Sequence, residues 1–199
     1  MKINSLFNVF AFILIITFVS CQDLVVQKED RTLENNKLIA QADVTSKEEN
    51  LSNINELVSY DIAFSDLNKI VQSSEYATKF NGTTSYTVFA PLNGAFKKLP
   101  KGTLEKLIAS ENKDELTAIM NCHIIPGTIN EQDMIKAINE GGGSVKLKTL
   151  GGTKLIASRK RGKIYLIDKN GNAGRLMKTD IEATNGVIHT LETVMMPRK

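Results

Sequence analysis

The sequence predicts an α+β domain in which a run of helices is followed by a run of strands. Apolar residues recur at helical spacing between residues 53 and 139, whereas from Val145 onward they alternate in short runs separated by turn signals. Helices first and strands second are typical of α+β domains. The segment that carries both patterns has about 150 residues, which is enough to bury a hydrophobic core.

The first residues of the chain have the pattern of a secretory signal. Lys2 precedes an apolar run over residues 6–19, which is too short to cross a bilayer comfortably. The run ends in Val19-Ser20-Cys21, which resembles a bacterial lipoprotein processing site, in which the cysteine is lipidated and becomes the new N-terminus. An uncleaved N-terminal anchor helix is the alternative, and either interpretation places the rest of the chain outside the cytoplasm.

We therefore expect a lipoprotein signal peptide over residues 1–20, an acylated Cys21 with a polar tether over residues 21–49, and a single domain over residues 50–199. The tether is expected because acidic residues outnumber basic ones there and apolar residues are few. With Cys21 acylated, Cys122 has no partner for an internal disulfide. The expected location is a bacterial cell envelope, with the lipid in the outer membrane.

The stretch Tyr86–Phe96 joins a strand directly to a short helix. Its first residues are mainly β-branched or aromatic, and Pro91 ends the strand because proline has no N–H for the ladder. Asn93 is expected to cap the short helix that follows. Helical spacing predicts further helices over residues 53–73, with one more turn through Phe80, and over residues 103–109, 113–121 and 130–139.

Most of the remaining segments are predicted strands. His123–Ile125 has the pattern of a strand that stops at Pro126-Gly127. Asn185-Gly186 is expected to make the turn before the last strand, because glycine tolerates positive φ. The alternating runs predict strands over residues 145–150, 153–158, 163–168, 175–182 and 187–195.

Three blocks of sequence resemble the signatures of the fasciclin domain and occur in the order typical of that family. They are Tyr86–Phe96, Asn121–Gly127 and Asp180–Glu192, the last of which begins Asp-Ile-Glu-Ala-Thr-Asn-Gly-Val-Ile-His. The resemblance covers residues 50–197 and implies a compact wedge of two packed β-sheets with short helices along one side. It also implies adhesion to another cell, a matrix or a polysaccharide.

The sequence contains no recognisable catalytic or metal-binding constellation. It has no nucleophile elbow, phosphate-binding glycine loop or Cys-x-x-Cys pair, and His123 and His189 are its only imidazoles. Two histidines and one thiol do not give the spacing of a zinc site. We expect no enzymatic activity and no cofactor.

Cys122 and His123 occupy the position of a Tyr-His pair that is implicated in adhesion in the fasciclin family, with Cys122 in place of the tyrosine. Adjacent residues of a regular strand face opposite sides of a sheet, so the two side chains are not expected to face the core together. Two interpretations of His123 stay open. It is either a buried, hydrogen-bonded structural residue, which the loss of the tyrosine favours, or a contact for a partner. His189 takes the structural interpretation.

Basic residues concentrate in the second half of the domain, where Asp168 is the single acid between residues 146 and 178. The densest group lies at a predicted turn between two strands and consists of Arg159, Lys160, Arg161 and Lys163. We interpret it as a docking surface for an anionic polymer: an acidic polysaccharide, lipopolysaccharide phosphates or anionic lipid headgroups. A solubilising surface that protects the strand edge is the alternative. Nucleic acid fits the charge but not the compartment.

The sequence thus predicts a lipid-anchored envelope protein whose single domain mediates adhesion to a cell surface, matrix or polysaccharide. The expected partners are the membrane, through the N-terminal lipid, and an anionic glycan or a surface protein, with no nucleic acid. The alternative is an envelope protein that binds a lipid or small molecule in a cleft between helices and sheet, which a sizeable apolar pocket would indicate. The oligomeric state is left open.

Overall fold

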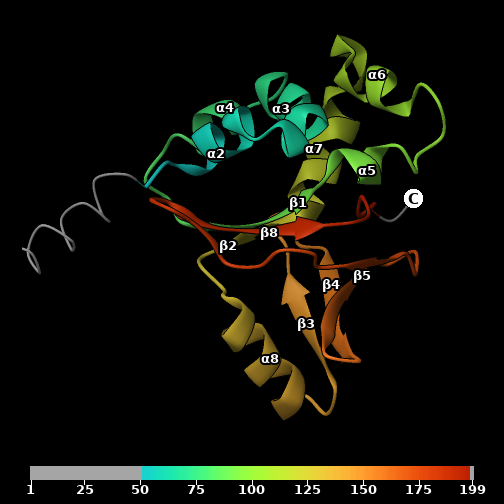
Figure 1. The fold of residues 1–199 in the computed structure, drawn as a ribbon. Helices are drawn as coiled ribbons and strands as arrows, with labels where there is room; N and C mark the ends of the chain where they lie inside the picture. Colours follow the sequence, from blue (N-terminus) through green and yellow to red (C-terminus); the bar gives the residue numbers. More distant parts are fainter. Residues whose placement is uncertain (1–50, 198–199) are drawn as a thin grey trace, which may run out of the picture. The chain divides into compact units, whose positions relative to one another are not determined.

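The structure is a computed structural model that describes residues 51–197 (Figure 1). The predicted signal peptide, the acylation site Cys21 and the tether lie outside the described residues and stay predictions. Within residues 51–197, none of the helices is long and apolar enough to cross a membrane.

Short helices dominate the first part of the described chain, as predicted. The predicted helical stretch over residues 53–73 is interrupted at Asp61, whose backbone is extended (φ −85°, ψ 115°) and whose side chain accepts a hydrogen bond from the Ala63 N–H (2.9 Å). The helices are α2 (Ile54–Tyr60), η1 (Ile62–Phe64), α3 (Ser65–Gln72), α4 (Tyr76–Lys79), α5 (Asn93–Phe96), α6 (Thr103–Ile108), η2 (Ser110–Asn112), α7 (Lys113–His123) and α8 (Glu131–Glu140).

The strands form two sheets, which confirms the predicted α+β class with two packed sheets. The first sheet has the order β2-β1-β8-β7, and the second has the order β3-β4-β5-β6 with antiparallel neighbours throughout. The strands are β1 (Tyr86–Pro91), β2 (Ile124–Pro126), β3 (Ser144–Lys148), β4 (Lys154–Lys160), β5 (Lys163–Ile167), β6 (Ala173–Arg175), β7 (Ile181–Ala183) and β8 (Gly186–Leu191).

The first sheet is the middle layer between the helices and the second sheet (Figure 1). Alternate residues of β1 face the two sides: Val88 and Ala90 belong to the core beneath the helices, whereas Phe89 belongs to the core between the sheets. Because both faces are covered, β1 is almost entirely buried. Most helices lie along one side of the first sheet, as predicted, but α8 is an exception and packs against β3 and β4.

The first and last strands of the domain lie side by side in parallel, with Tyr86 opposite Gly186. Gly186 has φ +142°, and a Cβ atom there would lie 1.9 Å from the Tyr86 carbonyl oxygen. Only glycine therefore allows the two backbones to approach this closely. The buried Asn185 side chain accepts a hydrogen bond from the Ile54 N–H (2.9 Å) and donates one to the Phe80 carbonyl (2.6 Å). The predicted turn at Asn185-Gly186 is confirmed, and it also ties the helices to the sheet.

The predicted single strand over residues 175–182 is wrong. The chain leaves the second sheet after Arg175 and enters the first sheet at Ile181, so the segment belongs to two different strands. Asp180 has φ +55°, a left-handed conformation that interrupts an extended run. The bend is stabilised by the Lys178 N–H, which donates to the Thr190 hydroxyl (2.7 Å).

Candidate functional site

His123 is the last residue of α7, so the prediction that it begins a strand is wrong. Its Nε2 atom accepts a hydrogen bond from the Met195 N–H (2.9 Å), which leaves the proton of the neutral ring on Nδ1, 2.8 Å from the Ile119 carbonyl oxygen. Burial lowers the pKa of His123 from 6.5 to about 4, against the opposing effects of the Ile119 bond and the Asp168 charge. The imidazole is therefore neutral and links the end of α7 to the C-terminal segment.

Cys122 is also buried, and its thiol is free. The helical backbone allows both side chains to point inward, so the strand-based prediction that Cys122 and His123 face opposite sides is wrong. Burial raises the pKa of the Cys122 thiol, which disfavours the reactive thiolate. With 1% and 2% of their surfaces exposed, neither residue forms part of the surface that a partner would meet.

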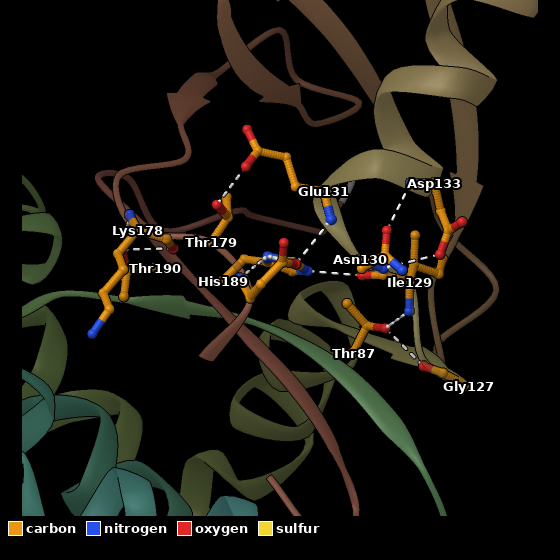
Figure 2. Close-up of polar contacts among 11 residues, drawn as sticks. Thr87, Gly127, Ile129, Asn130, Glu131, Asp133, Lys178, Thr179, His189 and Thr190 are labelled. Carbon is orange, nitrogen blue, oxygen red and sulfur yellow. Dashed lines mark hydrogen bonds and ion pairs between the residues drawn. The ribbon is translucent and has the colours of Figure 1, made fainter. Parts of the chain in front are cut away.

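His189 lies at the centre of a polar network that joins β8 to the start of α8 (Figure 2). Its Nε2 atom lies 2.8 Å from the Ile129 carbonyl oxygen, and its Nδ1 atom accepts a hydrogen bond from the Asp180 N–H (3.2 Å). The Asp180 carboxylate in turn accepts from the Glu131 N–H (2.8 Å), and the Glu131 carboxylate accepts from the Thr179 hydroxyl (2.8 Å). The ring also stacks on Phe89, with centroids 5.6 Å apart.

The hydrogen bonds of this network link β8, the start of α8 and the residues just before β7. Burial lowers the pKa of His189, so its ring, like that of His123, is neutral near pH 7. Thr87 extends the network into β1 by accepting from the Ile129 N–H (2.8 Å) and donating to the Gly127 carbonyl (2.7 Å) (Figure 2). Glu131 and Thr179 carry no sequence motif, and Thr87 lies in the Tyr86–Phe96 block with no signal for this role, so sequence reasoning missed all three. Among the residues that the structure describes, no group of three or more His, Cys, Asp or Glu side chains could hold a metal ion.

The basic hairpin is the turn between β4 and β5 and its flanking cations, Arg159, Lys160, Arg161 and Lys163. Its two central residues, Arg161 and Gly162, have φ of 50° and 76°, as in the tight turn that matches the twist of paired strands. Lys160 and Lys163 are directly opposite each other in the ladder. All four cations are exposed, and none of them forms an ion pair within residues 51–197.

Asp168, the single acid in this stretch, does not neutralise the hairpin. It is buried, with 4% of its surface exposed. Its carboxylate accepts hydrogen bonds from the backbone N–H groups of Asn170, Asn172 and Met196 (2.9 to 3.0 Å). Asp168 therefore fixes the turn after β5 and the C-terminal segment, while the surrounding surface keeps its positive charge.

Fold and site together define a two-sheet α+β module that buries both of its histidines and presents a basic surface. The fasciclin domain model matches residues 63–197. The chain belongs to the fasciclin family.

Relatives with this domain differ widely in length. The chain is 30% identical over 190 residues to Protein sll1483 of Synechocystis sp., and the match covers 96% of each chain. It is 37% identical over 137 residues to the transforming growth factor-beta-induced protein ig-h3 of Sus scrofa, where the match covers 69% of this chain and 18% of that protein.

A solved structure shares the fold. It is a FAS1 domain pair from the insect cell adhesion molecule fasciclin I, with a TM-score of 0.66 and 22% sequence identity. The match covers 73% of this chain and 51% of that chain.

Proposed function

We propose that this chain is a lipid-anchored adhesion module of a bacterial cell envelope that binds an anionic polymer through the basic hairpin. The observation that carries the proposal is the hairpin itself, whose exposed cations have no carboxylate partner among the described residues. Family membership supports adhesion, because a structurally similar protein is an insect cell adhesion molecule.

The N-terminal sequence supports anchoring. A short apolar run that ends in Val19-Ser20-Cys21 fits a lipidated N-terminus outside the cytoplasm. The polar segment over residues 21–49 would then act as a tether between lipid and domain. A domain held in this way would present its basic hairpin to polymers of the envelope or of a neighbouring surface.

The alternative, a small-molecule or lipid binder, gains no support from one of the surface hollows of the domain. One cavity of about 350 Å³ beside α5 and α6 is lined in part by Asp66, Lys69, Lys101 and Glu105. Binding sites for lipids and small molecules are mainly apolar, with only a few polar groups. A charged, open hollow of this kind does not match that pattern.

Retention on a polygalacturonate resin across a salt gradient tests the proposal. In the hairpin variant, the four cations of the basic hairpin are replaced by Gln. We expect the hairpin variant to elute at markedly lower salt than wild type, because attraction between surface charges dominates binding to the resin and salt screens this attraction. The matched control replaces four exposed lysines within or directly after helices by Gln and should elute close to wild type: Lys97, Lys106, Lys113 and Lys136. If the hairpin variant elutes with wild type, the hairpin only solubilises the domain.

A further inference from the structure

The second sheet has one face that no other described element covers, here called the outer face. Along β4, Leu155 and Ala157 are buried against the inter-sheet core and α8. Lys154, Ile156 and Lys160 are exposed on the opposite side. The same alternation continues on β3 and β5, so the outer face extends over neighbouring strands.

The strand register places lysines on the outer face in two directly opposed pairs. The near pair is Lys148 on β3 opposite Lys154 on β4, and the hairpin pair is Lys160 on β4 opposite Lys163 on β5. Lys154 and Lys160 are six positions apart along β4, which corresponds to about 20 Å along an extended strand. The two lysine pairs therefore stand at the two ends of the face, and Lys146 and Arg175 lie in the rows between them.

Like charges directly opposite each other destabilise a sheet. None of these four lysines has an ion-pair partner in the part of the chain that the structure describes. A sheet that breaks the same pairing rule at both ends carries a cost in folding free energy, and such costs concentrate at functional sites. An anionic partner would offset the repulsion at both ends.

Hydroxyl groups occupy the middle of the outer face. In the row between the lysine pairs, Ser144 lies opposite Ser158, Ser158 lies opposite Tyr165, and Tyr165 lies opposite Arg175. The row thus presents three hydroxyls and one guanidinium, which can donate hydrogen bonds to a hydrated partner. The neighbouring row holds Lys146, Ile156 and Ile167. Only 36% of the Ile156 surface is exposed.

We propose that the outer face is a two-ended clamp for a linear anionic polysaccharide that lies along the strands. The two lysine pairs contact acidic groups about 20 Å apart on one polymer, and the hydroxyl row contacts the sugars between them. This inference rests on the proposed function and extends its site from the basic hairpin to the whole outer face. A single small anion could not reach both pairs, and a bilayer would favour protruding apolar side chains over hydroxyls.

The clamp predicts a dependence on polymer length. Galacturonate oligomers shorter than the separation of the two pairs reach one pair at a time, whereas longer ones engage both and gain affinity through the effective concentration of the second contact. We expect the affinity of the full chain, carrying Cys21→Ser so that no lipid contributes, to rise steeply once the oligomer spans about 20 Å. Calorimetry or fluorescence anisotropy with size-fractionated oligomers measures this.

Two double variants test the ends separately, with Gln replacing both lysines of the near pair or both of the hairpin pair. Each should weaken binding of long oligomers about 5- to 30-fold and abolish the rise with length, because only one end remains. The matched control, Lys113→Gln with Lys136→Gln, removes the same charge from α7 and α8 and should keep the rise. A single cooperative thermal transition, at the wild-type temperature for the control and at or above it for the lysine-pair variants, would show that all variants are folded.

The outcomes separate this inference from the proposed function. If wild type binds long oligomers but the near-pair variant binds them equally well, the clamp is overturned while binding through the hairpin stands. If wild type binds no polygalacturonate at low salt, both proposals are overturned. Binding to phosphatidylglycerol vesicles without binding to the polymer would replace the polysaccharide by a membrane surface and would also overturn the clamp.

Discussion

His123 and His189 are held as neutral rings in opposite tautomers. The Met195 N–H donates to Nε2 of His123, whereas the Asp180 N–H donates to Nδ1 of His189. Each ring therefore pairs with a backbone group that would be unsatisfied without it. The sequence predicted a structural role for His189 and favoured one for His123, with a partner contact as the open alternative. It contained no signal for the N–H donors, Asp180 and Met195.

Removal of the His123 ring should destabilise the fold. In His123→Ala the buried Met195 N–H loses its acceptor, which should cost on the order of 1–3 kcal/mol. Urea denaturation followed by circular dichroism measures this loss at pH 7. The hypothesis that His123 is structural fails if the variant unfolds like wild type but no longer binds polygalacturonate.

Acid should destabilise the domain through the same residue. The pKa of His123 is 6.5 when unfolded and about 4 when folded, so between these values the unfolded chain binds a proton that the folded chain does not. The contribution of the neutral His123 ring to the unfolding free energy is therefore complete above pH 6.5 and is lost as pH falls through about 4. The loss amounts to at most roughly 3 kcal/mol. The lowered pKa of His189 acts in the same direction.

His123→Gln removes this titration while keeping a polar side chain. Unfolding free energies of the untagged protein at several pH values between 7 and 4 should fall more steeply for wild type than for the variant. His189→Gln should remove part of the remaining slope, since the chain has only two histidines. Identical slopes in wild type and both variants would show that carboxylates, not histidines, govern acid sensitivity.

At the scale of the element, the close pairing of β1 and β8 depends on one glycine. Gly186→Ala would place a Cβ atom 1.9 Å from the Tyr86 carbonyl oxygen and would strain a backbone with positive φ. We expect a loss of more than about 2 kcal/mol in unfolding free energy. Gly94→Ala is the matched control, because nothing lies within 4 Å of a Cβ atom there and its effect should be within about 0.5 kcal/mol. Equal stability of both variants would contradict the close approach.

Sequence patterns within a single turn or strand gave the most reliable predictions. The turn between the predicted strands over residues 145–150 and 153–158 and the turn of the basic hairpin follow from alternation and turn residues, and both connect antiparallel neighbours. Asn93 shows where local reasoning fails. Its side chain does not cap its own helix but accepts from the Asp66 N–H (3.0 Å), at the start of α3. A capping residue can serve any helix that packs nearby, and the sequence does not say which.

Contacts between distant elements could not be predicted from spacing alone. The wedge of two sheets came from the family resemblance, whereas alternation could not tell that residues 175–182 pass from one sheet to the other. The candidate surface was predicted only in part. The basic hairpin was visible as a run of cations, but the opposition of Lys148 and Lys154 depends on strand register. The register between two strands is determined by how the buried face of the sheet packs, and a single sequence does not show that packing.

At the scale of the whole molecule, the proposed lipidation of Cys21 would determine where the domain acts. Cys21→Ser should remove the acyl acceptor, so that the chain passes from the membrane fraction to the soluble fraction. Detergent phase partitioning of the two forms measures this change. Equal membrane retention of both forms would favour an uncleaved N-terminal anchor helix.

Adhesion through the basic surface is tested most directly with bacteria that express the full-length chain. The measurement is the retention of cells on a polygalacturonate-coated surface under flow, for wild type and for the hairpin variant. Antibody binding checks that both proteins are present in equal amounts on the cell surface. We expect wild-type cells to be retained at low salt and released as salt screens the charges, and cells with the hairpin variant to be retained only at background level. Equal retention of both, or background retention of wild type, would contradict adhesion through this surface.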